Sequence, residues 1–234
     1  MNTYTIEELL SPNPYAGRGI IIGKTDAKAI FAYFIMGRSE NSRNRVFIKN
    51  NDDIVINAFE PAKLSDPSLV IYSPVRVLDN KIIVTNGDQT DTIYDYIKKS
   101  STFEDALRSR CFEPDPPNFT PRISGIIEFC ANEFTYKLSI LKSQAQMGTV
   151  CDRFFYEYAP VDNIAHFIHT YKTDGNPIPS FEGEPERLHI SGNVENIAEQ
   201  IWNNLNEDNK VSLVVRSIDL NTKEVDEVLI NKNK

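Results

Sequence analysis

The sequence is poor in the residues that build metal centres and disulfide frameworks. It holds three cysteines and three histidines in 234 residues. Cys111, Cys130 and Cys151 lie about twenty residues apart without a C-x-x-C pair, so they fit neither a disulfide framework nor a zinc site. We expect reduced cysteines in the core. His166 and His169 lie three positions apart in a segment with β character and should point to opposite faces, so we predict no metal site.

Long apolar runs are also missing. No stretch approaches the roughly 18 residues of a membrane span, and the first ten residues, MNTYTIEELL, lack the basic-then-apolar order of a signal peptide. We therefore expect a cytoplasmic protein with no membrane partner. The net charge of −8 argues against a nucleic-acid partner, because binding of the phosphate backbone needs an excess of lysine and arginine. A small anionic ligand needs only a few local cations.

What the chain does contain is typical of a globular protein. With 41% hydrophobic and 25% charged residues, its 234 residues suffice for one domain with a proper core. We expect an arm at 1–14 and one domain at 15–234. Apolar patterning predicts strands at 20–22, 29–35, 46–48, 54–56, 68–77, 82–84, 123–130, 135–142, 149–158, 163–171, 211–218 and 227–230.

Helices are fewer than strands. They are expected at 6–10, at 101–110, at 194–205 and after residue 90, where Thr90 or Asp91 would be the N-cap. Residues 172–192 read as a loop with a solvated acidic run. Long β runs with few helices favour an α+β protein with large antiparallel sheets.

A positive cluster follows a predicted core strand in this acidic chain. The segment MGRSENSRNR, residues 36–45, carries three arginines within eight positions. Arginine, serine and asparagine side chains bind oxyanions and heterocycles through hydrogen bonds. The segment therefore indicates either an anion-binding loop or a solvated surface loop with ordinary ion pairs, and spacing alone favours neither.

A second candidate segment is rich in proline. Residues 111–122, CFEPDPPNFTPR, hold four prolines in eight positions, which predicts a stiff, extended loop. Such a loop is a good place to hold a catalytic carboxylate such as Glu113, and a plain linker fits the composition equally.

Two further segments carry polar candidates. Asn86 and Asp88 precede the helix expected after residue 90, where an anion would suit the helix N-terminus, although a capped helix explains them equally. Gly17-Arg18-Gly19 precedes a strand, which is the wrong context for a dinucleotide fingerprint. Arg18 is the residue there with obvious chemistry.

Four of these segments together resemble a known family. GRSENSRNR, VIYSPVR, VTNGDQTDTI and NFTPRISG, in that order, are similar to the motifs of archaeal-type inosine monophosphate (IMP) cyclohydrolases and their bacterial relatives. The resemblance covers about residues 15 to 130. It implies a four-layer α/β/β/α sandwich of two antiparallel sheets like that of N-terminal nucleophile hydrolases. Met1 and Asn2 offer no terminal nucleophile, so no autoprocessed nucleophile is expected.

The resemblance also implies a reaction. The carboxamide nitrogen of 5-formamidoimidazole-4-carboxamide ribonucleotide attacks its own formyl carbon, and loss of water gives IMP. This purine ribonucleotide would be the partner of the site, and no cofactor or metal is implied. A homo-oligomer is compatible with the sequence, which does not define the oligomeric state.

The family motifs imply roles for individual residues. Arg38, Tyr72 and Glu113 are expected to be catalytic, with Tyr72 donating to the formyl oxygen and Glu113 acting as general acid or base on the carboxamide. From the residues alone, a core or interface role is the commoner fate for a strand tyrosine such as Tyr72, and Glu113 also fits a surface glutamate. The expected substrate-binding residues are Arg18, Ser39, Asn41, Arg43, Arg45, Asn86, Asp88, Asn118, Thr120 and Arg122.

Two other functions compete with ring closure. A non-catalytic nucleotide-sensing protein would keep the phosphate-binding arginines, but it would not need Tyr72 and Glu113. An amidohydrolase would need a nucleophile, and the sequence has neither a terminal Cys, Ser or Thr nor a G-x-S-x-G elbow.

Overall fold

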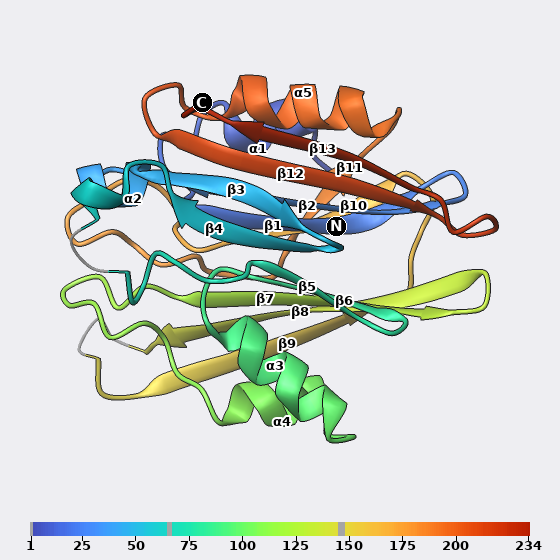
Figure 1. The fold of residues 1–234 in the computed structure, drawn as a ribbon, viewed down its shortest axis with the longest axis horizontal. Helices are drawn as coiled ribbons and strands as arrows, with labels where there is room; N and C mark the ends of the chain where they lie inside the picture. The colour runs from blue at the N-terminus through green and yellow to red at the C-terminus, as the bar shows by residue number, and fades with distance from the viewer. Residues whose placement is uncertain (1, 65–66, 145–147) are drawn as a thin grey trace.

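Two antiparallel sheets packed face to face form the body of the protein (Figure 1). The computed structural model describes residues 2–64, 67–144 and 148–234. The six-stranded sheet contains, in spatial order, β11 (Glu186–His189), β10 (Ile164–His169), β1 (Arg18–Thr25), β2 (Lys28–Met36), β12 (Lys210–Asp219) and β13 (Val225–Asn231). The seven-stranded sheet contains β3 (Arg45–Asn50), β4 (Asp53–Ala58), β5 (Val75–Leu78), β6 (Lys81–Thr85), β7 (Arg122–Cys130), β8 (Glu133–Ser143) and β9 (Cys151–Tyr158).

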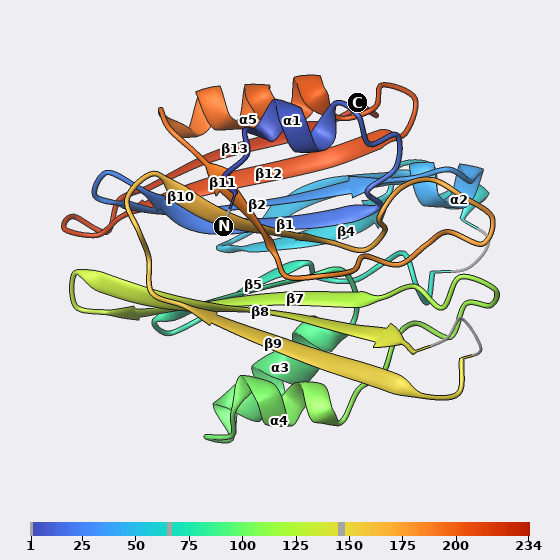
Figure 2. The same ribbon diagram turned by 180° about the vertical axis from the view of Figure 1, so that it is seen from behind.

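Helices lie on the outer face of each sheet. Figure 2 shows α1 (Ile6–Leu10) and α5 (Val194–Asn204) over the six-stranded sheet, and α3 (Gln89–Lys98) and α4 (Phe103–Arg108) under the seven-stranded one. Two short elements, α2 (Glu40–Arg43) and the 3₁₀ turn η1 (Pro61–Lys63), lie in connections. This arrangement confirms the expected α+β class with two antiparallel sheets.

The central strands β1 and β2 are buried on both faces, which explains their almost continuous apolar sequences. Phe31 and Tyr33 of β2 point into the core between the sheets. Ala32 and Phe34, one position along, pack under α1 and α5. Because side chains alternate along a strand, β2 contributes to two cores at once.

The arm at 2–14 is packed against the domain. Thr5 and Glu8 form a capping box at the start of α1, and Ile6 and Leu10 are buried in the core under α5. Beyond the helix, the side chain of Asn209 donates to the carbonyl oxygen of Pro14 at 3.1 Å. The arm therefore leads the chain into the six-stranded sheet along a defined path.

The structure corrects four local predictions. The strand expected at 68–77 is confined to β5, because Pro74 has no amide hydrogen for a ladder. The loop expected at 172–192 contains β11, which pairs with β10. The N-cap of α3 is Asp88 instead of Thr90 or Asp91. The cysteines are free as expected, but Cys111 and Cys130 are exposed and Cys151 is half-buried, so the core assignment was wrong.

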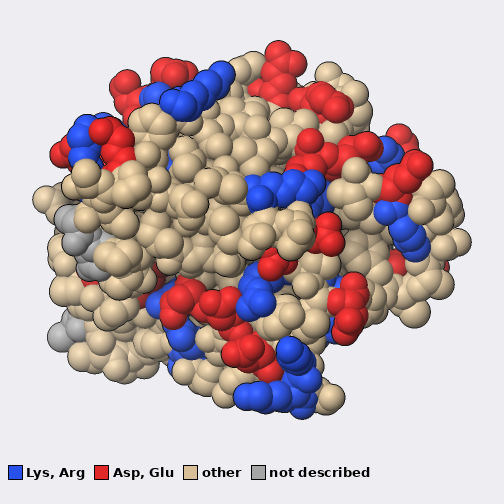
Figure 3. Space-filling model, in the orientation of Figure 1, with Lys and Arg blue, Asp and Glu red and all other residues tan. Residues whose placement is uncertain are grey.

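The sequence predicted neither a membrane span nor a metal site. Among the described residues, no helix is long and apolar enough to cross a membrane. The same part of the chain holds no group of three or more His, Cys, Asp or Glu side chains that could bind a metal. On the face shown in Figure 3, basic and acidic side chains are interspersed, and no continuous positive patch is seen there.

Asn231 links the two sheets at their edge. Its Oδ1 accepts from the backbone nitrogen of Phe47 at 2.8 Å and from the hydroxyl of Ser212 at 2.7 Å. Its Nδ2 donates to the carbonyl oxygen of Phe47 at 3.0 Å. One side chain at the end of β13 thus joins β12 of one sheet to β3 of the other.

We expect the Asn231→Ala variant to lose about 1–3 kcal/mol of unfolding free energy, because it leaves backbone groups of β3 without their partners. Chemical denaturation monitored by circular dichroism measures this loss. The control is Asn221→Ala, in the exposed β12–β13 turn, whose side chain makes no hydrogen bond within the described residues. Equal losses in the two variants would contradict the linking role of Asn231.

Candidate active site

Segments far apart in the sequence meet at the end of the sandwich where β2 leads into α2. The start of β1, residues 38–42, residues 69–70 and the proline-rich loop enclose a cavity of about 320 Å³. Seven of the predicted site residues line it: Arg18, Arg38, Ser39, Asn41, Glu113, Asn118 and Thr120. The other six are not among its lining residues: Arg43, Arg45, Tyr72, Asn86, Asp88 and Arg122.

Arg18 and Glu113 form a buried charged pair at this cavity. Nη2 of Arg18 lies 3.7 Å from Oε2 of Glu113, and the side chains are 10% and 2% exposed. Burial raises the pKa of Glu113 to about 7, although the positive charges of Arg18 and Arg122 oppose the rise. A carboxyl group with a pKa near 7 can take up and release a proton at neutral pH, as a general acid or base requires.

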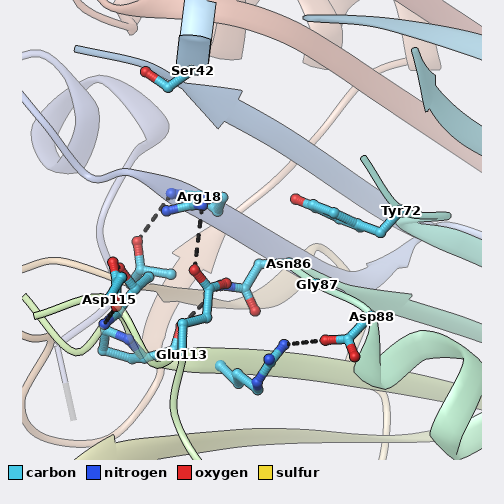
Figure 4. Close-up of polar contacts among 12 residues, drawn as sticks. Arg18, Ser42, Tyr72, Asn86, Gly87, Asp88, Glu113 and Asp115 are labelled. Atoms are coloured by element: carbon cyan, nitrogen blue, oxygen red, sulfur yellow. Dashed lines mark hydrogen bonds and ion pairs between the residues drawn. The ribbon is translucent and has the colours of Figure 1, made fainter. Parts of the chain in front are cut away.

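Tyr72 approaches the same arginine from a different segment. It lies before β5 and is 8% exposed. Figure 4 shows the Tyr72 hydroxyl and the Glu113 carboxylate both turned toward Arg18. The Tyr72 hydroxyl lies 2.8 Å from the hydroxyl of Tyr33 on β2. Arg18 is therefore the shared neighbour of a phenol and a carboxyl group, the two predicted proton-transfer groups.

The proline-rich loop is held closed by its own hydrogen bonds. The backbone nitrogen of Glu113 donates to the carbonyl oxygen of Thr120 at 2.9 Å, and the backbone nitrogen of Thr120 donates to Asp115 at 2.6 Å. The Thr120 hydroxyl lies 2.5 Å from that of Tyr171, which follows β10. These bonds restrict the position of Glu113.

A polar network behind Glu113 joins the loop to the start of α3. Arg122 donates to Oε1 of Gln89 at 2.7 Å, and Gln89 donates to Oδ1 of Asn86 at 3.0 Å. Arg122 also pairs with the carboxylate of Asp88 at 2.7 Å. Asn86 is fully buried and bonds the backbone on both sides of Arg122. Asn86, Asp88 and Arg122 therefore shape the wall behind Glu113.

Gly87 allows this network to close around the carboxyl group. A Cβ at this position would lie 2.5 Å from Nη1 of Arg122, 2.6 Å from Oε1 of Gln89 and 3.5 Å from Oε1 of Glu113. The first two separations are shorter than real Cβ contacts, so a side chain would displace Arg122 and Gln89, whose network lies beside the Glu113 carboxyl group.

The rim of the cavity carries Arg38, Ser39 and Asn41. The Arg38 side chain is 36% exposed and pairs with Asp174. Its guanidinium carbon lies 5.2 Å from the centre of the Tyr15 ring, within the range of a cation–π contact. The structure therefore places Arg38 at the mouth of the cavity, while Arg18 is the arginine in contact with Glu113.

The two other arginines of the cluster do not line the cavity, although Arg45 lies close behind it, near Tyr72 and Arg18. Arg45 is fully buried and donates to the carbonyl oxygens of Ser42 at 2.7 Å and Met36 at 3.2 Å, so it ties α2 to the end of β2. Burial lowers its pKa from the usual value. Arg43 is exposed, donates to Asn209 at 3.0 Å and lines a separate cavity.

Several polar atoms at the site are buried without a hydrogen-bond partner among the described residues. They are Nε of Arg18, Nη1 of Arg45, Oε1 of Glu113 and Nε of Arg122. Such atoms usually cost free energy in a folded protein, and they concentrate where a protein binds a ligand or performs chemistry.

The sequence did not single out some residues that the structure brings to the cavity. Tyr15, Ser42, Asp115 and Tyr171 all line it. Ser42 and Asp115 lie inside the two candidate segments, so their position in the sequence was a usable signal. Tyr15 and Tyr171 stack on each other with ring centres 5.7 Å apart, a long-range pairing that no local pattern announces.

Comparison with known proteins gives a consistent result. A family model described as "IMP cyclohydrolase-like protein" matches residues 15–224. The protein called IMP cyclohydrolase from Methanococcus aeolicus is 30% identical over 165 residues, which cover 68% of this chain and 74% of the relative. The proteins of that name from Methanocella arvoryzae and Haloquadratum walsbyi are 32% and 34% identical over 118 and 117 residues. Those matches cover 48% of this chain and 57% and 56% of the relatives.

The raised pKa of Glu113 makes a prediction about stability. Its folded-state pKa of about 7 lies above the ordinary 4.5, so the contribution of the neutral carboxyl is present below pH 4.5 and lost as the pH rises through 7. Between pH 5 and pH 8, the parent should lose up to about 3 kcal/mol of unfolding free energy that Glu113→Gln does not lose.

Denaturant titrations at the two pH values measure this difference. Glu182→Gln serves as the control, because the side chain of Glu182 is 68% exposed. A parent and a Glu113→Gln variant with the same pH dependence would show that burial does not perturb this carboxyl group.

Proposed function

The chain belongs to the IMP cyclohydrolase-like protein family, and on that premise we propose that it is an IMP cyclohydrolase. It closes the second ring of the purine in 5-formamidoimidazole-4-carboxamide ribonucleotide. A bond forms between the carboxamide nitrogen and the formyl carbon, and the formyl oxygen leaves as water. The observation that carries the proposal is the buried Glu113, with a pKa near 7, beside Arg18 and Tyr72.

Glu113 is the group that accepts the proton of the attacking nitrogen. An amide nitrogen is a weak nucleophile, so removal of its proton during attack lowers the barrier. The carboxylate form is needed for this step, and a pKa near 7 keeps a substantial fraction of it at neutral pH. The closed loop and the network behind it hold this base in place, as an intramolecular attack requires.

Tyr72 and Arg18 stabilise the formyl oxygen. Negative charge develops on that oxygen as the nitrogen attacks, and donors in a buried site stabilise it strongly. The Tyr72 hydroxyl supplies a proton, while the unpartnered Nε of Arg18 supplies charge and a donor. Water takes a second proton when it leaves, and Glu113 returns to it the proton taken from the carboxamide nitrogen. The formamido nitrogen gives up its own proton as the new double bond forms, which restores Tyr72.

The rim residues hold the ribose phosphate. Arg38 offers a guanidinium group near the mouth of the cavity, with Ser39 and Asn41 beside it. Asn118 and Thr120, across the cavity, are close to where the ribose would lie. In this assignment the predicted catalytic role of Arg38 becomes a binding role, and Arg18 takes the place next to the reacting atoms.

The layering supports a finer fold assignment. Helices outside two stacked antiparallel sheets are the arrangement expected for a relative of the N-terminal nucleophile hydrolases, here with an acid–base site in place of a terminal nucleophile.

A nucleotide-sensing protein would also use the rim arginine. It would have no use for a buried carboxyl group with an adjusted pKa, so ring closure is the better assignment.

We expect purified protein to convert the formamido-carboxamide ribonucleotide to IMP, and Glu113→Gln to lower kcat about 10²- to 10⁴-fold, as for loss of a general base. The growth of hypoxanthine absorbance measures the rate. Because the base acts when deprotonated, kcat/KM of the parent should rise with pH through about 7, while the variant should lack that rise.

The exposed Glu182→Gln variant is the control and should retain the activity of the parent. Ring closure that is unaffected by Glu113→Gln would keep the reaction and reject this base. A parent that binds IMP tightly without converting the precursor would be a sensor instead.

A further inference from the structure

Tyr33 lies directly behind the proposed site and has one polar partner. It sits in the middle of β2 and is 0% exposed, in the core between the sheets. Its hydroxyl lies 2.8 Å from that of Tyr72 and makes no other hydrogen bond within the described residues. A buried tyrosine hydroxyl requires a partner, and in this case the partner is a proposed catalytic group.

Tyr72 needs such support because its own segment is irregular. It precedes β5 and lies outside the sheet ladder. Within the described residues, its backbone makes one hydrogen bond, from the nitrogen of Ile56 to the Tyr72 carbonyl oxygen at 3.0 Å. That bond holds the main chain of Tyr72. The orientation of its ring depends on side-chain packing and on the contact of its hydroxyl with Tyr33. Tyr33, by contrast, is held on both sides by strands β1 and β12.

The surroundings of the two hydroxyls bear on which of them donates the hydrogen bond. Arg18 and Arg45 lie near both hydroxyls, and cations attract the lone pairs of a phenol oxygen. The Tyr33 hydroxyl has no second acceptor within the described residues, so its proton is satisfied only when it donates to Tyr72. With Tyr33 as the donor, the proton of Tyr72 is not used within the described part of the chain and is available to the cavity side.

We propose that Tyr33 is a positioning residue, which donates to the Tyr72 hydroxyl oxygen and thereby directs the Tyr72 proton into the cavity toward the formyl oxygen. A hydroxyl that accepts from one neighbour is free to donate to another. The contact also fixes the ring of Tyr72 from the rigid centre of the six-stranded sheet. This inference rests on the proposed ring closure, and it adds a residue that never touches the substrate.

Tyr33→Phe tests the role, because it removes the hydroxyl and leaves the buried ring. We expect kcat for ring closure to fall about 5- to 20-fold, the effect of one hydrogen bond that matters mainly in the transition state. KM should stay within about twofold of the parent, because ground-state binding does not use this contact. Initial rates across a range of precursor concentrations separate the two constants.

A double-mutant cycle tells positioning from general damage. Tyr72→Phe should lower kcat more than Tyr33→Phe does, and adding Tyr33→Phe to it should cost nothing further, because the group being positioned is gone. A merely structural tyrosine would give additive losses in the double variant. Additive losses, or an unchanged kcat in Tyr33→Phe, would overturn the proposal.

Tyr136→Phe is the matched control. Tyr136 lies in the same inter-sheet core, is 1% exposed, and bonds Nδ1 of His166 at 2.6 Å, away from the cavity. The Tyr136→Phe variant should lose about as much thermal stability as Tyr33→Phe but keep the kcat of the parent. A similar fall of kcat in this control would also overturn the role of Tyr33. A parent without ring closure would overturn the proposed function itself, which separates the two failures.

Discussion

The burial of one carboxyl group among arginines is the constraint on which the rest of the site depends. An ionised Glu113 away from water would be costly without partners, and Arg18 at 3.7 Å with Arg122 behind it offsets part of that cost. The balance leaves the pKa of Glu113 near 7 instead of far above it. Small displacements of either arginine would shift the balance. The closed loop, the Asn86–Gln89–Arg122 network and the side-chain-free Gly87 therefore serve one purpose, which is fixed geometry around this group.

The site exists because both sheets end at the same place. Arg18 and Tyr33 come from the six-stranded sheet, while Arg122 starts β7 of the seven-stranded one. Side chains that leave opposing sheets between the layers meet in a region shielded from water, where hydrogen bonds and charges act strongly. Helices pack on the outer face of each sheet. Tyr72 is the exception, since it reaches the site from an irregular segment and depends on its neighbours for its orientation.

Much of this arrangement could be predicted, and the misses have physical causes. The apolar runs of β1 and β2, the amphipathic α5 and the stiffness of the proline-rich loop follow from local pattern, and the structure contains them. The prediction of a strand around Tyr72 was wrong, because Pro74 has no amide hydrogen to donate to the hydrogen-bond ladder of a neighbouring strand. β11 was missed because a short edge strand in a polar segment is formed by its pairing with β10, which no local signal records.

The sequence by itself determined the class of fold, the order of most elements and the family, because periodicity and ordered motifs are properties of the chain. It also located the segments that carry the site. Only the tertiary structure decided which arginine meets Glu113. Arg38, Arg43 and Arg45 look alike in sequence, yet one lies at the rim, one faces away and one is fully buried. Arg18 takes the inner position because the start of β1 happens to face the loop across the sandwich, and such a contact depends on packing over long distances in the chain.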